Sequence, residues 1–309
     1  MSNIFLDSGL SDDERRRHLY DGDLFVYSAT VASRALTELG RELLAEAFHP
    51  HDPRMAQFHL PVEEFAAILA KVKPSFIHHP RAKECLKQLL LELRCDPDKT
   101  YFDVPRMRSM AHGDYLKAGI AYAFHPHRDT WYSAPFCQLN WWMPMYEIEP
   151  DNAMAFHPRY WSQAVKNGSS GYNYYEWNRY NRANAAQFIK EDTRVQPHAD
   201  EPLEMEPQIR LICPPGGIII FSGAQMHSTV PNTSGHTRYS IDFRTVHLDD
   251  VAERRGAVNV DSACTGTTMR DYLRATDLSH VPDELVALYD DGTAIAGDVV
   301  YRPPTMTTG

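Results

Sequence analysis

The chain has 309 residues, 43% of them hydrophobic and 23% charged, so it can bury a sizeable core as one large domain or two small ones. A formal net charge of −10 and a pI near 5.8 argue against a nucleic-acid partner, because such proteins usually carry a basic surface. The longest apolar runs, such as 136–145 and 217–221, are far shorter than the roughly 20 residues that span a bilayer, so no membrane span is predicted.

The first third of the chain, residues 1–98, is predicted to form a mainly helical support. Residues 1–12 lack the basic start and apolar stretch of a secretion signal, which predicts a cytoplasmic protein. Ser11 can cap a helix that opens with the acidic residues 12–14, since acids suit the positive end of the helix dipole. Further helices are expected after Thr30, at Pro61 and at Pro74, with 74–95 as the best helical run.

From residue 99 to 248 the composition changes to that of a β core. Short runs rich in Ile, Val, Phe, Tyr and Trp alternate with clusters of Pro, Gly and Asn, which is typical of strands joined by turns. A helical layer packed on a β core is the simplest architecture. The tail, 249–309, is of mixed character, with short helices expected at 269–273 and 283–289 and a loosely held end.

One interval inside the core, residues 157–207, lacks the alternation of a strand. It gathers Tyr, Trp, Asn, Gln and charged residues, as in SGYNYYEWNRYNRAN at 170–184. A segment of this length without strands is usually functional or disordered, and its aromatic content argues against disorder. We therefore expect a lid or a substrate-contacting insertion, with a dimer contact as the alternative.

The His-x-Asp motif recurs among the 15 histidines, for example at 127/129, 198/200 and 247/249, so the motif by itself is a weak signal. The motif at 127/129 follows an apolar, strand-like run, GIAYAF at 119–124. It also has a candidate histidine partner 100 residues later, in another strand-rich region. Residues two apart on a strand point to the same side, so His127 and Asp129 are expected to converge.

The expected third ligand is His227. Gly216-Gly217 begins a β-branched strand and Ser222-Gly223 turns the chain shortly before this histidine. Two imidazoles and one carboxylate suit a borderline divalent metal and leave three adjacent coordination positions open, as oxygen-activating Fe(II) requires. The predicted metal ligands are His127, Asp129 and His227.

Eleven residues after His227, Arg238 opens a strand of alternating character. Three of its apolar residues share one face and are expected to pack under the helices: Tyr239, Ile241 and Phe243. The alternate residues then face the interior of the core or water: Arg238, Ser240, Asp242 and Arg244. A guanidinium binds a carboxylate through two parallel hydrogen bonds, so Arg238 is the candidate for binding a dicarboxylic cosubstrate, with a surface salt bridge as the alternative.

This order of motifs over about residues 100–247 resembles the Fe(II)/2-oxoglutarate-dependent oxygenases, specifically the phytanoyl-CoA dioxygenase-like superfamily. Residues 152–158, NAMAFHP, are similar to the family's Asn-Gly-apolar…Pro-Gly-Ser-His segment, and 227–238, HSTVPNTSGHTR, to its His…Ser…Pro-Asn-x-Ser…Arg run. Ala153 stands where glycine is common, and His157-Pro158-Arg159 replaces the usual Pro-Gly-Ser-His. These departures affect loop shape and leave the metal ligands intact.

The resemblance implies an α+β fold with a double-stranded β-helix (jelly-roll, cupin-like) core, flanked by helices from the N-terminal third and the C-terminal tail. It implies Fe(II) as the metal, 2-oxoglutarate and O2 as cosubstrates, and His127, Asp129 and His227 as the catalytic ligands. Arg238 and Thr229 would bind the far carboxylate of 2-oxoglutarate. Chlorinating members leave the position of Asp129 open for halide, so halogenation is not expected.

The strand at 136–143 places Gln138, Asn140 and Trp142 on one face. Polar side chains on a buried strand need partners, so we expect this face to line the active-site cavity with Gln138 near the cosubstrate, or else to form a structural network. Further residues close to the motif are candidates for substrate contact, with packing or ion pairing as the alternative: Trp131, Tyr132, Arg106, Arg108 and Lys117. His125 is the residue most easily mistaken for the ligand.

The predicted function is oxidation of a C–H bond or amine in a small polar metabolite, such as an amino acid or a natural-product intermediate of secondary metabolism. Hydroxylation is the first expectation, with desaturation, cyclisation or N-oxidation as further outcomes. The alternatives are a cupin-type metal-dependent isomerase or hydrolase that does not use 2-oxoglutarate, and an inactive sensor that retains the fold. The protein is expected to be a monomer or homodimer whose partner is its substrate, with five free cysteines.

Overall fold

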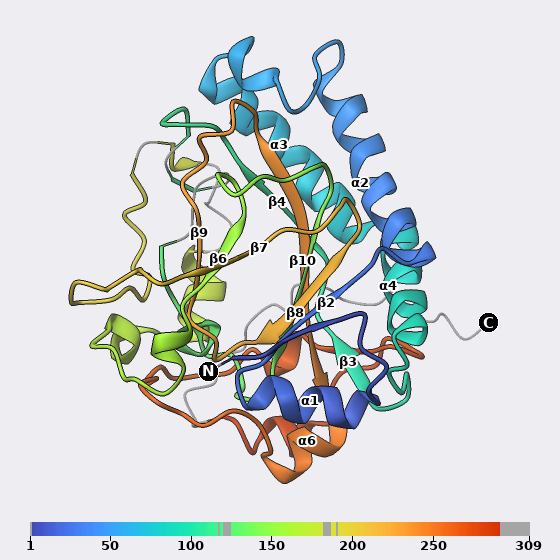
Figure 1. The fold of residues 1–309 in the computed structure, drawn as a ribbon, viewed down its shortest axis with the longest axis vertical. Coiled ribbons are helices and arrows are strands. Elements are labelled where there is room, and N and C mark those ends of the chain that lie inside the picture. Colours follow the sequence, from blue (N-terminus) through green and yellow to red (C-terminus); the bar gives the residue numbers. More distant parts are fainter. Residues whose placement is uncertain (1, 117, 120–124, 182–186, 190, 291–309) are drawn as a thin grey trace.

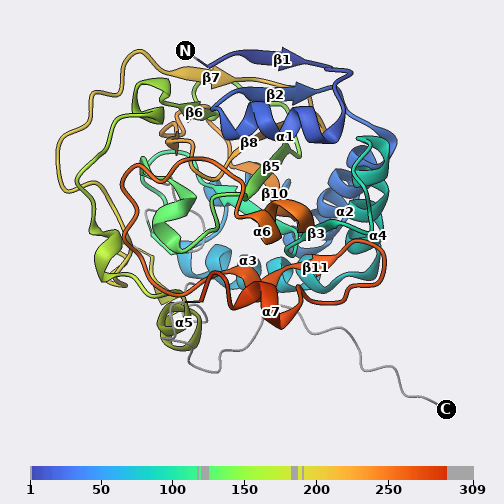
Figure 2. The same cartoon turned by 90° about the horizontal axis from the view of Figure 1, so that it is seen from below.

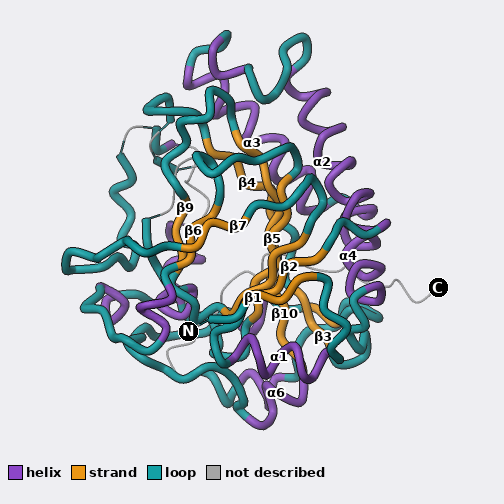
Figure 3. The backbone as a smooth tube through the Cα atoms, in the orientation of Figure 1, coloured by secondary structure: helices purple, strands orange, loops and turns teal. Residues whose placement is uncertain are grey.

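Two β-sheets form the centre of the molecule, and helices cover the outer face of the larger sheet (Figure 1). The computed structural model describes residues 2–116, 118–119, 125–181, 187–189 and 191–290. Figure 3 shows the strands gathered in the middle, long helices along one side and mostly loops on the other.

The larger sheet has eight strands in the described part of the chain, in the order β1-β2-β8-β5-β10-β3-β11, with β4 also paired to β10. The strands are β1 (Ile4–Leu6), β2 (Leu24–Tyr27), β3 (Thr100–Phe102), β4 (Arg106–Met110), β5 (Leu139–Pro144), β8 (Ile218–Ser222), β10 (Arg238–His247) and β11 (Leu273–Arg274). β10 is ten residues long, so it pairs with β5 along one edge and with β4 and then β3 along the other.

The smaller sheet has the order β7-β6-β9 and faces the larger one. Its strands are β6 (Met154–Phe156), β7 (Ile209–Leu211) and β9 (His227–Thr229). An isolated antiparallel bridge between His127 and His227 adds the first metal-motif segment beside β9. Residues of both sheets, including Trp142 and Phe156, form one apolar cluster between them.

Four helices from the first third of the chain support the larger sheet: α1 (Asp12–Tyr20), α2 (Val31–Phe48), α3 (Val62–His78) and α4 (Pro80–Glu92). Tyr239, Ile241 and Phe243 of β10 are fully buried in the core cluster that these helices help to form. The predicted apolar face of β10 is therefore confirmed. In Figures 1 and 2, α2 and α4 lie side by side on the same flank.

The predicted helix starts are confirmed at three positions and wrong at one. Ser11, Thr30 and Pro61 are all N-caps, and Ser11 forms a capping box with Glu14. No helix begins at Pro74: α3 runs through this proline, and the next helix starts at Pro80. Pro74 costs α3 one backbone hydrogen bond, but apolar residues before and after it bury the same helix face, and that packing keeps the helix continuous.

Two strands were missed in the segment expected to be mainly helical. β2 pairs with β8, with Phe25 opposite Ile220, and β1 extends the sheet beside it, as Figure 2 shows at one edge. The run Leu24–Tyr27 has only four residues, too few for periodicity to separate a buried strand from a helix segment. The N-terminal third therefore supports the core both as a helical layer and as an extension of its sheet.

The described residues of the insertion at 157–207 form short helical turns: η3 (Pro158–Trp161), η4 (Gly168–Gly171), α5 (Tyr174–Glu176) and η5 (Trp177–Asn181). The remaining short elements are η1 (Ala56–Phe58), η2 (Asp129–Tyr132), α6 (Leu248–Glu253), η7 (Met269–Asp271) and α7 (Asp283–Val286). The helix expected at 269–273 is a single turn followed by β11, and the expected loose end of the tail lies outside the described residues. All five cysteines are free thiols. No helix in the described ranges combines the length and apolar character needed to cross a membrane.

Candidate metal centre

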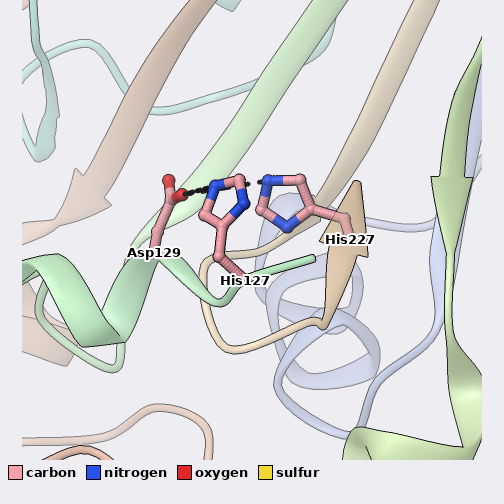
Figure 4. A group of neighbouring side chains, drawn as sticks. All are labelled: His127, Asp129 and His227. Atoms are coloured by element: carbon pink, nitrogen blue, oxygen red, sulfur yellow. Dashed lines mark ion pairs between the residues drawn. The ribbon is translucent and has the colours of Figure 1, made fainter. Parts of the chain in front are cut away.

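The structure brings together the three predicted ligands, His127, Asp129 and His227, with one donor atom of each within 4.8 Å of the others (Figure 4). All three side chains are buried. His127 and His227 exchange two backbone N–H···O hydrogen bonds of 3.0 Å, so the bridge between their segments sets the two imidazoles side by side. This is the only such group of ligand atoms among the described residues, so no other His-x-Asp motif contributes to one.

Arg128 explains why the side chains on either side of it converge. Its backbone is extended, with φ −111° and ψ 141°, although Asp129 then begins the turn η2 and not a longer strand. The Arg128 side chain points away from the ligands and donates to the backbone oxygen of Ala224 and to the Asp261 carboxylate. Sequence reasoning missed this anchor because nothing local indicates its partner, 133 residues away.

Hydrogen bonds fix the orientation and tautomer of both imidazoles. Nδ1 of His127 lies 2.8 Å from the His125 carbonyl oxygen, and Nδ1 of His227 lies 2.9 Å from that of Gln225. Each Nδ1 must donate its proton to the carbonyl, which leaves the Nε2 lone pair available. The two Nε2 atoms lie 3.5 and 3.8 Å from Oδ1 of Asp129. The two Nε2 atoms and Oδ1 of Asp129 therefore form a cluster of three donor atoms that a bound cation would stabilise.

The other carboxylate oxygen of Asp129 is held by two amides. Oδ2 accepts hydrogen bonds from Gln138 Nε2 at 2.8 Å and from Asn140 Nδ2 at 2.9 Å. Oε1 of Gln138 in turn accepts a hydrogen bond of 2.7 Å from the Tyr272 hydroxyl. Gln138 therefore orients a ligand carboxylate, a role more specific than the predicted position near the cosubstrate. Gln138, Asn140 and Trp142 all line the cavities of the site, as expected for this face of β5.

The electrostatic environment keeps the ligands in their metal-binding form. Burial raises the pKa of Asp129, but its neighbours His127 and Arg244 outweigh this effect and hold the pKa well below its ordinary value. Arg244 Nε lies 3.6 Å from Oδ2. Burial, followed by the nearby His127, lowers the pKa of His227 to about 3. Two neutral imidazoles and a carboxylate on one side of a metal position match the donor set of non-haem Fe(II) sites.

A cavity of about 130 Å³ beside the ligands is lined by Arg238 and Thr229. Arg238 is buried and donates from one terminal nitrogen to the Asn152 carbonyl oxygen at 3.0 Å, while its Nε has no partner among the described residues. Its guanidinium lies over the Trp142 ring, 5.4 Å from the centroid. Burial lowers the pKa of Arg238 to about 10, so it stays cationic at neutral pH. We call this cavity the smaller chamber.

A second cavity, of about 550 Å³, also reaches His127 and Asp129, and we call it the larger chamber. The insertion lines part of it with Tyr172, Tyr174 and Trp177. Three of the predicted substrate-contact candidates line this chamber: Tyr132, Arg106 and Arg108. Trp131 is buried and donates its indole N–H to the Asp261 carboxylate. Lys117 lies outside the described residues. His125 is not a ligand, since its Nε2 lies 3.0 Å from the Pro197 carbonyl oxygen in the insertion.

No protein-family model matches the sequence, and no curated protein matches it. Solved structures that match include EvdO2 from Micromonospora carbonacea var. aurantiaca (12% identity, TM-score 0.36, covering 56% of this chain and 62% of that one), also solved with 2-oxoglutarate. Others are the non-heme alpha ketoglutarate dependent epimerase SnoN from nogalamycin biosynthesis (13%, 0.38, 76% and 84%) and AviO1 from Streptomyces viridochromogenes Tue57 (11%, 0.37, 77% and 96%). The chain thus spans less than two thirds of EvdO2. The neighbours include non-haem iron and 2-oxoglutarate enzymes.

Proposed function

We propose that this protein is an Fe(II)- and 2-oxoglutarate-dependent oxygenase that acts on a small polar metabolite. The observation that carries the proposal is the buried, preoriented ligand set of His127, Asp129 and His227. Such a set occupies one face of the metal and leaves three adjacent positions for exchangeable ligands. Bound Fe(II) would activate O2 as the oxidant, 2-oxoglutarate would supply two electrons, and the protein would supply binding and orientation.

The proposal includes a jelly-roll core formed by the two sheets in a single domain. The chain passes alternately between them: β4 in the larger sheet, the His127 bridge in the smaller, β5 in the larger, β6 and β7 in the smaller, β8 in the larger, β9 in the smaller and β10 in the larger. The spatial order β8-β5-β10-β4 faces β7-β6-β9 and the bridge. Alternation of this kind supports a double-stranded β-helix with the metal ligands at the mouth between its sheets.

Arg238 and Thr229 would hold the far carboxylate of 2-oxoglutarate in the smaller chamber. Arg238 is cationic and has an unused buried Nε–H donor, and a carboxylate can accept from Nε–H and a second N–H of the same guanidinium. A buried donor without an acceptor costs free energy, which supports a ligand at this position. Trp142 under the guanidinium shields the ion pair from water.

The remaining residues of the site hold the ligands in place. Gln138 and Asn140 fix the carboxylate of Asp129, and backbone carbonyl groups fix the two imidazoles. Neither a protein nucleophile nor a protein acid or base is needed, so the catalytic residues are the metal ligands themselves. Side chains of the insertion close part of the larger chamber, where the substrate would be held away from water. Hydroxylation is the simplest outcome, with desaturation, cyclisation or N-oxidation open to the same site.

Anaerobic titration of the Fe(II) protein with 2-oxoglutarate tests the proposal. We expect a metal-to-ligand charge-transfer absorption in the visible region, and O2-dependent formation of succinate that increases with the right substrate in a screen. His227→Ala should abolish both signals. Absence of both signals from the wild-type protein refutes the proposal and favours a cupin-type isomerase or hydrolase, and full biological activity of His127→Ala favours an inactive sensor.

A further inference from the structure

The larger chamber carries more positive than negative charge on its lining. Its cationic side chains in the described ranges are Lys73, Arg106, Arg108, Arg194 and Arg244. The carboxylates that line it there are Asp103, Asp129 and Asp271. Asp129 belongs to the metal, and Asp271 accepts a hydrogen bond from the Tyr174 hydroxyl. Arg194 is paired with Asp192, so the excess of cations comes from the other four side chains.

The three arginines among these four side chains share two carboxylates, Asp103 and Asp242. Arg108 binds Asp242 through two hydrogen bonds of 2.6 and 3.2 Å. Asp103 accepts from both Arg106 and Arg244, in the latter case at 3.3 Å. Lys73 contributes a further positive charge when it is protonated. With Asp129 assigned to the metal, the three arginines outnumber the two carboxylates that they share, so the charges of these described side chains sum to a positive value.

Lys73 projects from α3, the helix that packs against β4 and its two arginines. Partial burial and then the charge of Arg108 lower the pKa of Lys73 to about 7. Cations crowded along a cavity with low-dielectric walls attract anions, because field lines concentrate in such clefts. A bound anion would offset the repulsion between Lys73 and Arg108.

Resting on the proposed function, we propose that the substrate carries an acidic group, a carboxylate or a phosphate, which Lys73, Arg106 and Arg108 bind in the larger chamber. This set differs from the one assigned to 2-oxoglutarate, because Arg238 lines the smaller chamber. Lys73 and Arg106 line only the larger chamber, whereas Arg108 and Arg244 line both. Lys73 and Arg106 are therefore the residues whose substitution separates substrate binding from cosubstrate binding.

The other side chains that line the chamber indicate the size and shape of the uncharged part of such a substrate. Tyr132, Tyr172 and Trp177 supply aromatic surface, and Tyr132 packs edge-on against the ring of the ligand His127, with centroids 5.5 Å apart. The volume of about 550 Å³ is within the range of small-molecule sites. An acid with a planar or ring-shaped body would place its charged group against Lys73, Arg106 and Arg108. Its body would then lie against these aromatic side chains, next to the metal.

Matched acids and amides test the proposal without knowledge of the natural substrate. The probes are benzoate, phenyl phosphate and benzamide, the uncharged counterpart of benzoate. Their dissociation constants are measured by equilibrium dialysis with Zn(II)-loaded protein saturated with 2-oxoglutarate, which cannot turn over. We expect at least one of the two acids to bind about tenfold tighter than benzamide, as one or two charge-assisted hydrogen bonds allow. Preference for phenyl phosphate over benzoate identifies a phosphate substrate, and the reverse a carboxylate.

Lys73→Met and Arg106→Met should each reduce this preference by about tenfold and leave the Fe(II)/2-oxoglutarate absorption unchanged, and Lys73→Arg should restore it. The control is Lys71→Met, an exposed lysine on the same helix, which should behave as wild type. Equal binding of acids and amide to the wild-type protein overturns the proposal, as does a preference that survives in Lys73→Met and Arg106→Met. A protein that prefers acids but shows no 2-oxoglutarate absorption refutes the proposed function while the anion site stands.

Discussion

Replacement of Arg238 separates binding of 2-oxoglutarate from binding of the metal. Arg238→Met keeps a side chain of similar length over Trp142 but removes the charge and all donors. The variant loses the Nε–H donor and a second N–H toward the carboxylate, at about 1.5–3 kcal/mol for each hydrogen bond to a charged group. The dissociation constant of 2-oxoglutarate should therefore rise roughly 10²- to 10⁴-fold. Arg238→Lys keeps the charge without the two-pronged geometry and should cost roughly tenfold.

The assay is anaerobic titration of the Fe(II) protein, followed by its charge-transfer absorption. Metal affinity, measured separately with Co(II), should stay at the wild-type value because none of the three ligands changes. Arg210→Met is the matched control, since this arginine lies exposed on β7 and donates to the Pro150 carbonyl oxygen. If Arg238→Met binds 2-oxoglutarate as tightly as Arg210→Met, the role assigned to Arg238 and to the smaller chamber is wrong.

Three further predictions concern the ligand set. Gln138→Leu and Asn140→Leu should each weaken Co(II) binding by roughly 10- to 100-fold in calorimetric titrations, because each removes a hydrogen bond that orients Asp129; unchanged affinity would exclude this role. Removal of the metal by a chelator should lower the melting temperature by roughly 5 °C relative to protein with metal at a hundredfold excess over its dissociation constant, and added Mn(II) should reverse the change. Burial lowers the pKa of His125 to about 4 and that of His227 to about 3, so both histidines take up a proton in the unfolded chain at a higher pH than in the folded protein. The free energy of unfolding of the metal-free protein, measured in urea, should therefore decrease by roughly 1.4 kcal/mol per pH unit for each histidine between pH 6 and 4. A free energy of unfolding that does not change over this range would contradict the prediction.

The metal site was predictable because each step depends on a short-range rule. Residues two apart in an extended segment point the same way, which brings His127 and Asp129 together through the extended backbone of Arg128. The same alternation along β10 separates the buried Tyr239 from Arg238, which lines the smaller chamber. The order of the motifs then selected the His-x-Asp at 127/129 over the other occurrences.

Features that depend on distant partners were not predictable from local patterns. Arg128 is held by Asp261 in the tail and by carbonyl groups of the insertion, and no spacing rule relates these segments. Pro74 carried a misleading local signal, since the packing of α3 on the core outweighed the loss of one hydrogen bond. Gln138 was expected near the cosubstrate, but it lines the larger chamber, and its contact with Asp129 depends on how η2 returns to β5.

The positively charged side chains of the larger chamber could be predicted in part from the sequence. Alternation alone puts Arg106 and Arg108 on one face of β4, and Asp242 and Arg244 on one face of β10. Only the pairing register, with Asp242 opposite Arg106, sets these charges beside one another. A slip of one residue would turn both β4 arginines to the opposite face and leave the half-buried Asp242 without them. The positive charge that we assign to substrate binding therefore depends on two features of the folded protein. These are the register between β4 and β10 and the position of Lys73 on α3.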